Sequence, residues 1–167
     1  MAIKDALLPE FDHEMGTTRK LLACAPMADR DWTPHAKSMS VGDLVKHVAE
    51  IPGWAGGIVD ADSWDAASGG DAPKKVYTSN DEAIADFDAG VAKARAAIES
   101  KSDAEWMQTW TLKNGDQEIM SMPKMGVVRS FLMNHLIHHR GQLSVYIRLK
   151  DVAVPSIYGP SADEKAF

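Results

Sequence analysis

The sequence feature that most constrains the fold is the spacing of apolar residues, which recur every three or four positions in four long segments. Spacing of this kind marks one face of an amphipathic helix. The segments cover residues 9–25, 40–58, 79–98 and 123–150. Four such helices in 167 residues predict an all-α protein, a four-helix bundle, that forms a single domain over residues 1–167.

Prolines and capping residues mark where these helices begin or bend. We expect the first helix to begin near Pro9, because a proline in the first turn lacks only an N–H that would have no helical partner there. Ser40 and Ser79 are suitable N-caps for the second and third helices, each with an acidic residue three positions later. Pro52 should kink the second helix, because it cannot donate a hydrogen bond to the carbonyl four residues earlier.

Two stretches break the helical pattern. Residues 60–78 show no periodicity and include a run rich in glycine and proline at 68–73, which predicts a surface loop. Residues 108–112 and 117–120 flank the pair Asn114-Gly115, which favours a tight turn between two strands. We therefore expect a long loop after the second helix and a small β-hairpin before the last one.

The charge balance and the single cysteine exclude several classes of protein. With 24 Asp and Glu against 18 Lys and Arg, the formal charge is −6, whereas a general nucleic-acid binder needs a basic surface. No signal-peptide pattern and no apolar run of membrane-spanning length are present, so we expect a cytoplasmic protein without a nucleic-acid or membrane partner. Cys24 is the only cysteine, which excludes an intrachain disulfide.

Histidines are concentrated in one place, because three of the six fall within residues 135–139. In a regular helix His135 and His139 lie about 40° apart and about 6 Å along the axis, in the middle of the apolar face of the last helix. The same construction places His47 on the apolar face of the second helix. The spacing therefore predicts that three imidazoles from two helices point into the bundle.

Other residues of these two helices are placed by the same construction. His138 falls at the edge of the apolar face, where it either faces solvent or supports a metal ligand. Gln142 lies near the axis of the inward histidines, so its amide either orients an imidazole or a bound water, or bonds to the backbone. We expect the interior glycine Gly141 to reflect close packing against a neighbour. The outer sides of the two helices hold Val45, Ala49 and Arg140.

Three inward imidazoles need hydrogen-bond or metal partners. Burying them costs about 1–3 kcal/mol for each group that stays unsatisfied. One divalent cation satisfies all three nitrogens at once, and the spacing of His135 and His139 allows two rings of one helix to meet on one ion. The alternative is a set of core histidines that bond to backbone carbonyls or tyrosines. The clustering on two helices favours the metal ion.

Two other kinds of metal site are inconsistent with the sequence. A zincin has a glutamate directly after the first histidine as general base, but Leu136 occupies that position. A di-iron bundle needs two Glu-x-x-His motifs, and only Glu10 with His13 forms one. No catalytic acid or base is assigned. The tryptophans that we expect to be core or loop anchors, rather than a cage for a substrate, are Trp54, Trp64, Trp106 and Trp110.

Three segments together resemble the DinB/YfiT-like family of bacterial metalloproteins. These are Leu44–Glu50, the His135–Leu143 segment with its HxxxHRGQL pattern, and the tail Val154–Glu164. The resemblance spans nearly the whole chain. It implies that His47, His135 and His139 are the metal ligands, with nickel or zinc as the usual ion. It also implies a homodimer and a bundle wound up-up-down-down with a long crossover.

The expected function follows from a metal with three neutral ligands and one open position. Such a metal acidifies a bound water or thiol, which leads to hydrolysis or to transfer of a thiolate onto a small-molecule electrophile. Some members of the DinB/YfiT-like family look like thiol-dependent S-transferases or isomerases that use a low-molecular-weight thiol. We therefore expect a metal-dependent hydrolase or thiol S-transferase whose substrate the sequence does not identify.

Two rival functions stay open at this point. One is a non-catalytic metal-binding or stress-linked module, and the other is a bundle whose histidines only stabilise the core. A further hypothesis concerns the loop at residues 60–78, where Trp64 would cover the open coordination position.

Overall fold

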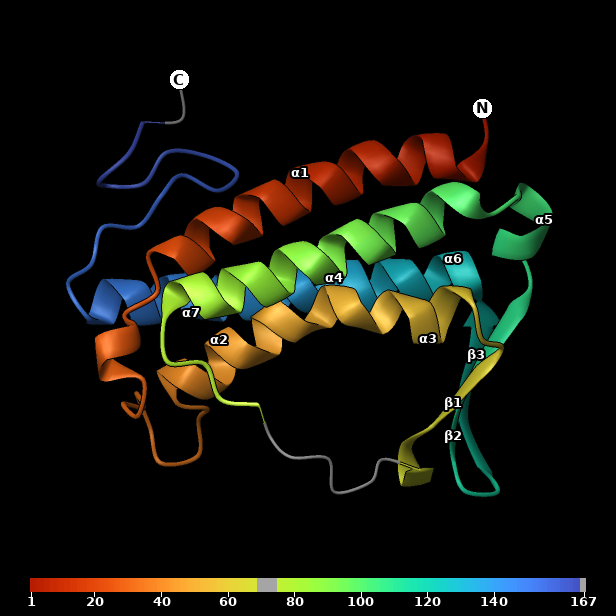
Figure 1. Cartoon of the computed structure of the whole chain (residues 1–167), viewed down its shortest axis with the longest axis horizontal. Helices are drawn as coiled ribbons and strands as arrows, with labels where there is room; N and C mark the ends of the chain where they lie inside the picture. Colours follow the sequence, from red (N-terminus) through yellow and green to blue (C-terminus); the bar gives the residue numbers. More distant parts are fainter. Residues whose placement is uncertain (69–74, 166–167) are drawn as a thin grey trace.

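The computed structural model describes residues 1–68 and 75–165, which fold mainly into helices (Figure 1). Three short strands form a small sheet at one end of the helices. The helices are α1 (Ile3–Ala23), α2 (Val41–Glu50), α3 (Ala55–Val59), α4 (Asn80–Ser100), α5 (Asp103–Trp106), α6 (Lys124–Val127) and α7 (His135–Leu149). The strands are β1 (Ser63–Asp65), β2 (Thr109–Asn114) and β3 (Gln117–Pro123).

The first helix begins at Ile3, so the prediction that it begins at Pro9 is wrong. Carboxylates satisfy the N–H groups that a helix start leaves without partners. Asp5 accepts from the Ala2 N–H at 2.9 Å, and Asp103 accepts from the Ile3 N–H at 2.8 Å. The second of these bonds comes from a distant part of the chain, which explains why the local sequence did not indicate the earlier start.

The other predicted caps and the proline kink are confirmed. Ser40 accepts from the backbone N–H of Asp43 at the start of α2, and Ser79 accepts from that of Glu82 at the start of α4. A 3₁₀ segment at Ile51–Trp54 contains Pro52 and separates α2 from α3.

The helices run in different directions from those that the family resemblance implied. The pairs between α1 and α4 are Arg19–Asp88 and Asp12–Arg95. Glu10 of α1 pairs with Arg129, which precedes α7 on the same helical stretch, and Glu14 of α1 pairs with Arg140 of α7. Residue numbers therefore fall along α4 as they rise along α1, whereas they rise together along α1 and α7. α2 runs against α7, because Tyr146 contacts Met39 while His47 faces His135.

The winding is thus up-down-down-up, and the expected up-up-down-down order is wrong. The stretch that connects α1 to α2 turns the chain back at the end of α1, so these two helices are antiparallel (Figure 1). The long crossover is present, but it joins α3 to α4, which run in the same direction. A chain that leaves one helix and enters a parallel one must return along the length of the helices, which is why the 60–78 stretch is long.

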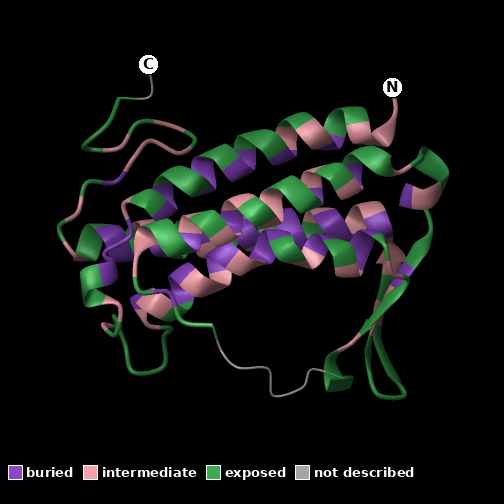
Figure 2. Cartoon of the chain, viewed as in Figure 1, coloured by how far each residue is buried: buried purple, intermediate pink, exposed green. Residues whose placement is uncertain are grey.

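Buried apolar side chains from the helices form one core, with exposed residues on their outer sides (Figure 2). The prediction that Val45 and Ala49 face outward is wrong, because their exposed fractions are 0% and 1%. α2 packs against α4 on one side and α7 on the other. A helix buried on two sides has no single apolar face, so a wheel centred on His47 misplaces the second buried side.

The last predicted helix, residues 123–150, contains a π-helical segment at Val128–Asn134 between α6 and α7. Met133 lies opposite to His135 and is nevertheless fully buried, so this stretch is buried on both sides. Segments of this kind are frequent at functional sites, and this one ends directly before His135.

The β-hairpin is confirmed, and the sheet has a third strand that was not predicted. β2 and β3 pair antiparallel, and β1 adds to β2 in parallel. β1 has only three residues and lies inside the 60–78 stretch that was predicted to be a loop. Residues 69–74 of that stretch lie outside the described residues. None of the described helices is both long and apolar enough to cross a membrane.

Two glycines are expected to respond to alanine substitution in opposite directions. Gly115 starts the hairpin turn with φ of +61°, a region that costs a residue with a Cβ about 1 kcal/mol or more. An added Cβ at Gly141 would meet no described atom within 4 Å, so the expected close packing there is wrong. Urea unfolding should show Gly115→Ala losing about 1 kcal/mol and Gly141→Ala gaining about 0.5–1 kcal/mol. A loss of stability in both variants would contradict this account.

Candidate metal centre

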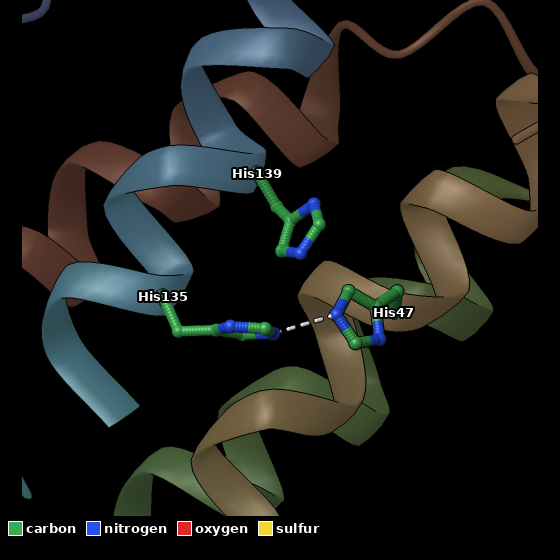
Figure 3. A group of neighbouring side chains, drawn as sticks. All are labelled: His47, His135 and His139. Carbon is green, nitrogen blue, oxygen red and sulfur yellow. Dashed lines mark hydrogen bonds between the residues drawn. The ribbon is translucent and has the colours of Figure 1, made fainter. Parts of the chain in front are cut away.

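Three histidine rings from two helices face a common point (Figure 3). His47 comes from α2, while His135 and His139 come from the first two turns of α7. The Nε2 atoms of His47 and His135 are 2.9 Å apart, and one ring nitrogen from each of the three residues lies within 4.8 Å of the others. The predicted convergence of these side chains is therefore confirmed.

The cluster was predicted to lie at the centre of the helices, but it is only half-buried. All three histidines have intermediate exposure. Burial, followed by the positive charges that His139 and His135 can carry, lowers the pKa of His47 to about 4. Burial also lowers the pKa of His135, followed by the effect of His139. Both rings are therefore neutral at pH 7, which is the form that coordinates a metal.

The spacing and chemistry of the donors fit one divalent ion. Imidazole nitrogens lie about 2.0–2.1 Å from zinc, so two nitrogens of a tetrahedral site are about 3.3 Å apart. The observed ring nitrogens reach this spacing with small side-chain rotations, because they already lie within 4.8 Å of one another. The alternative partner is internal, since one of the Nε2 atoms of His47 and His135 can donate to the other.

Gln142 contacts one ring of the cluster from behind. Its Oε1 atom lies 2.8 Å from Nδ1 of His139. An amide oxygen only accepts, so this contact places the proton of His139 on Nδ1 and leaves the lone pair of Nε2 free. Such contacts orient metal-binding histidines in many proteins.

The remaining histidines take no part in the cluster. His138 is exposed, with its ring centroid 4.9 Å from that of His139. His13 and His35 are also exposed and belong to other parts of the fold.

Trp54, which was predicted to be a core or loop anchor, is a direct neighbour of the cluster. Its ring centroid is 5.5 Å from that of His47 and 5.4 Å from that of His135. The helical wheel contained an indication of this, because Trp54 falls about 20° from His47 when the second helix is treated as regular. A tryptophan at helical spacing usually belongs to a core, however, and so the wheel alone does not distinguish the two roles.

Arg140 was predicted to face outward, and this is wrong: its exposed fraction is 1%. Its guanidinium forms an ion pair with the Glu14 carboxylate of α1 at 2.7 Å and donates to the Tyr158 hydroxyl of the C-terminal tail at 2.6 Å. The Tyr158 hydroxyl in turn donates to the Glu14 carboxylate at 2.9 Å. These bonds fix α7 to α1 at the residue directly after His139.

The fold and the site define a mostly helical protein with a small sheet and a half-buried three-histidine cluster of metal-binding type. The DinB family model matches residues 1–166, so the chain belongs to the DinB family. This confirms the family resemblance drawn from the two histidine segments and the tail.

The chain is also similar to individual proteins in sequence or in fold. The uncharacterized protein YrdA of Bacillus subtilis (strain 168) is 46% identical over 41 residues, a match that covers 25% of this chain and 25% of that protein. Two solved DinB-like proteins share the fold. The first, YjoA of Bacillus subtilis, has a TM-score of 0.67 at 17% identity, over 96% of this chain and 99% of its own. The second, from Bacillus cereus ATCC 10987, has a TM-score of 0.69 at 18% identity, over 92% of this chain and 97% of its own.

Proposed function

We propose that His47, His135 and His139 bind one divalent metal ion, nickel or zinc, and that the protein is a metal-dependent enzyme acting on a small molecule. The observation that carries this proposal is the convergence of three half-buried imidazoles, two of them with lowered pKa values. Three neutral ligands leave the charge of the cation uncompensated and one tetrahedral position open.

The metal would supply acidity, since a bound divalent ion lowers the pKa of water or of a thiol that reaches its open position. The three histidines hold the ion, and Gln142 keeps the His139 ring in the orientation that presents Nε2. No glutamate follows His135, and a metal-bound thiol needs none, because it is deprotonated outright, whereas a metal-bound water keeps a pKa of about 7. This favours an external low-molecular-weight thiol as the nucleophile over water.

The two reaction types differ in the bond that forms. In thiol transfer, the thiol releases its proton to solvent, sulfur bonds to the electrophilic carbon, and the leaving group departs with the electron pair of its bond to that carbon. In hydrolysis, a water oxygen bonds to an acyl carbon and the bond from that carbon to the leaving group breaks. One proton of the water ends on the leaving group, and the other stays on the acid that forms. On this proposal the protein is a single-domain cytoplasmic protein, as its length and sequence patterns predicted, and a homodimer, as the family resemblance implied.

A specific observation favours a second candidate, a non-catalytic metal-binding or stress-linked module. The described cluster contains three histidines and no carboxylate that would act as a general acid or base. A module that only holds an ion needs no such group.

A kinetic comparison separates these two functions. Metal-loaded protein is assayed with a chromogenic aryl halide and a panel of low-molecular-weight thiols, and with a nitrophenyl ester in water. We expect a thiol-dependent rate that falls at least about a hundredfold in His135→Ala, because the acidity is lost with the ion, whereas the exposed neighbour variant His138→Ala keeps the wild-type rate. Equal rates in wild type and His135→Ala, or no rate with any nucleophile, would contradict the proposed enzyme and favour the non-catalytic module.

A further inference from the structure

An apolar pocket of about 180 Å³ opens beside the histidine cluster. Its walls come from the 3₁₀ segment and α3, from β1 and β2, and from the π-helical segment before α7. The lining residues are Trp54, Ile58, Trp64, Trp110, Leu112 and Phe131. The pocket therefore lies where the small sheet meets the end of the helices that carry the histidines.

The pocket and the cluster share a wall. Trp54 lines the pocket, and its ring centroid lies 5.5 Å from that of His47 and 5.4 Å from that of His135. Phe131, a second lining residue, precedes His135 on the same continuous helical stretch. A molecule in this pocket thus lies one aromatic ring away from the imidazoles.

The chemistry of the walls selects an uncharged, apolar group. None of the described lining residues carries a charge. The indole N–H of Trp110 already donates to the Gly57 carbonyl at 2.9 Å. A carboxylate placed here would lose its hydration without gaining an ion pair, which is costly.

The exposure of Trp64 and the size of the pocket both indicate that the pocket binds a small ligand. Trp64 is 45% exposed, although its ring lies against Gly57, where an added Cβ would come within 3.1 Å of the indole. A large aromatic side chain left this exposed next to an apolar hollow gains burial when a ligand fills the hollow. The size matches a benzene ring, since an engineered protein cavity of about 150 Å³ binds benzene.

We propose that this pocket binds the apolar arm of the substrate, an uncharged group about the size of a phenyl ring, and so places the reacting centre at the histidine cluster. The proposal rests on the proposed enzymatic function and names its substrate class: small electrophiles with an aryl or short alkyl arm. It also changes the expected role of Trp54, Trp64 and Trp110 from anchors to walls of a binding site.

Binding is tested by fluorine NMR with para-fluorobenzyl alcohol, in wild type and in the metal-site variant His135→Ala. Both should bind the probe equally, because the pocket does not depend on the ion. Leu112→Arg places a charge in the pocket and should weaken binding at least about tenfold. Ile119→Arg is the matched control, because Ile119 is 52% exposed on the same hairpin and does not line the pocket, and it should bind like wild type.

Two additions make the result decisive. Trp64→Ala should also weaken binding. Because this position is half-exposed, the variant tests the pocket even if Leu112→Arg does not fold. The anion para-fluorobenzoate should bind at least about tenfold more weakly than the alcohol. Equal binding of alcohol and anion, equal affinity in the pocket and control variants, or no binding to wild type would overturn the proposal.

The kinetic arm separates the pocket from the chemistry. In metal-loaded protein, Leu112→Arg should lower kcat/KM for an aryl electrophile at least about tenfold, and leave a small polar electrophile unaffected. Equal losses for the two electrophiles would overturn the assignment of the pocket to the substrate arm. Probe binding that persists in a protein without any measurable turnover would count against the proposed enzyme and not against the pocket.

Discussion

His135→Ala is expected to lose the divalent ion that wild-type protein retains at about one per chain after purification without a histidine tag. His135 contacts both other members of the cluster, with its Nε2 atom 2.9 Å from that of His47 and its ring centroid 4.5 Å from that of His139. Removing a group that only orients a ligand costs about 10–100-fold in metal affinity, so removing a ligand should cost at least the upper value. Elemental analysis measures the metal content of each protein, and competition with a chelator measures its metal affinity.

Two neighbours give a graded control for this experiment. Gln142→Leu removes the acceptor that orients His139 and should weaken metal binding about tenfold. His138→Ala changes an exposed ring and should leave the affinity unchanged. Equal metal content in wild type and His135→Ala would mean that the cluster is held by its own hydrogen bond between His47 and His135, and the metal site would then have to be abandoned.

The direction in which each histidine of the cluster points was predictable, because it depends only on the regular geometry of its own helix. His135 and His139 both follow the π-helical segment, so the regular period that relates them is undisturbed. His47 lies before the 3₁₀ segment that contains Pro52, so its helix is regular as well. The half-burial was not predictable, because it depends on how the helices pack and not on which face a residue occupies.

The errors on the same helices have one physical cause, which is burial on more than one side. A helical wheel assumes one apolar face, but α7 packs against both α1 and α2, and α2 packs against both α4 and α7. Arg140 therefore lies in an interface opposite to the ligands, where only a partner carboxylate from another helix makes its burial favourable. That partner, Glu14, is far away in the sequence and gives no local indication.

The direction of the helices and the third strand also depend on distant contacts. The sequence indicated the length of the 60–78 stretch but not which helices it joins in parallel. β1 forms because its three residues pair with residues 111–113 of β2, and so short a strand has no periodicity of its own. The hairpin was predictable, since Gly115 supplies the positive φ that its turn requires.

The second large effect is expected at the buried ion pair between Glu14 and Arg140. Arg140→Ala should destabilise the protein by about 3–5 kcal/mol in urea unfolding, because the Glu14 carboxylate stays buried without its cation. The side chains of Glu14 and Arg140 are 7% and 1% exposed, so water does not replace the lost partner. The Tyr158 hydroxyl loses the same donor, which should also loosen the C-terminal tail from α1.

Arg95→Ala is the matched control, because it breaks an arginine–carboxylate pair with Asp12 whose side chains are 43% and 45% exposed. An exposed pair of this kind contributes about 0–1 kcal/mol. Replacing both buried partners, as Glu14→Leu with Arg140→Met, should recover most of the loss, since no unpaired charge is then left inside. If Arg140→Ala costs no more than Arg95→Ala, water reaches the Glu14 carboxylate, and the pair does not hold α7 against α1 next to His139.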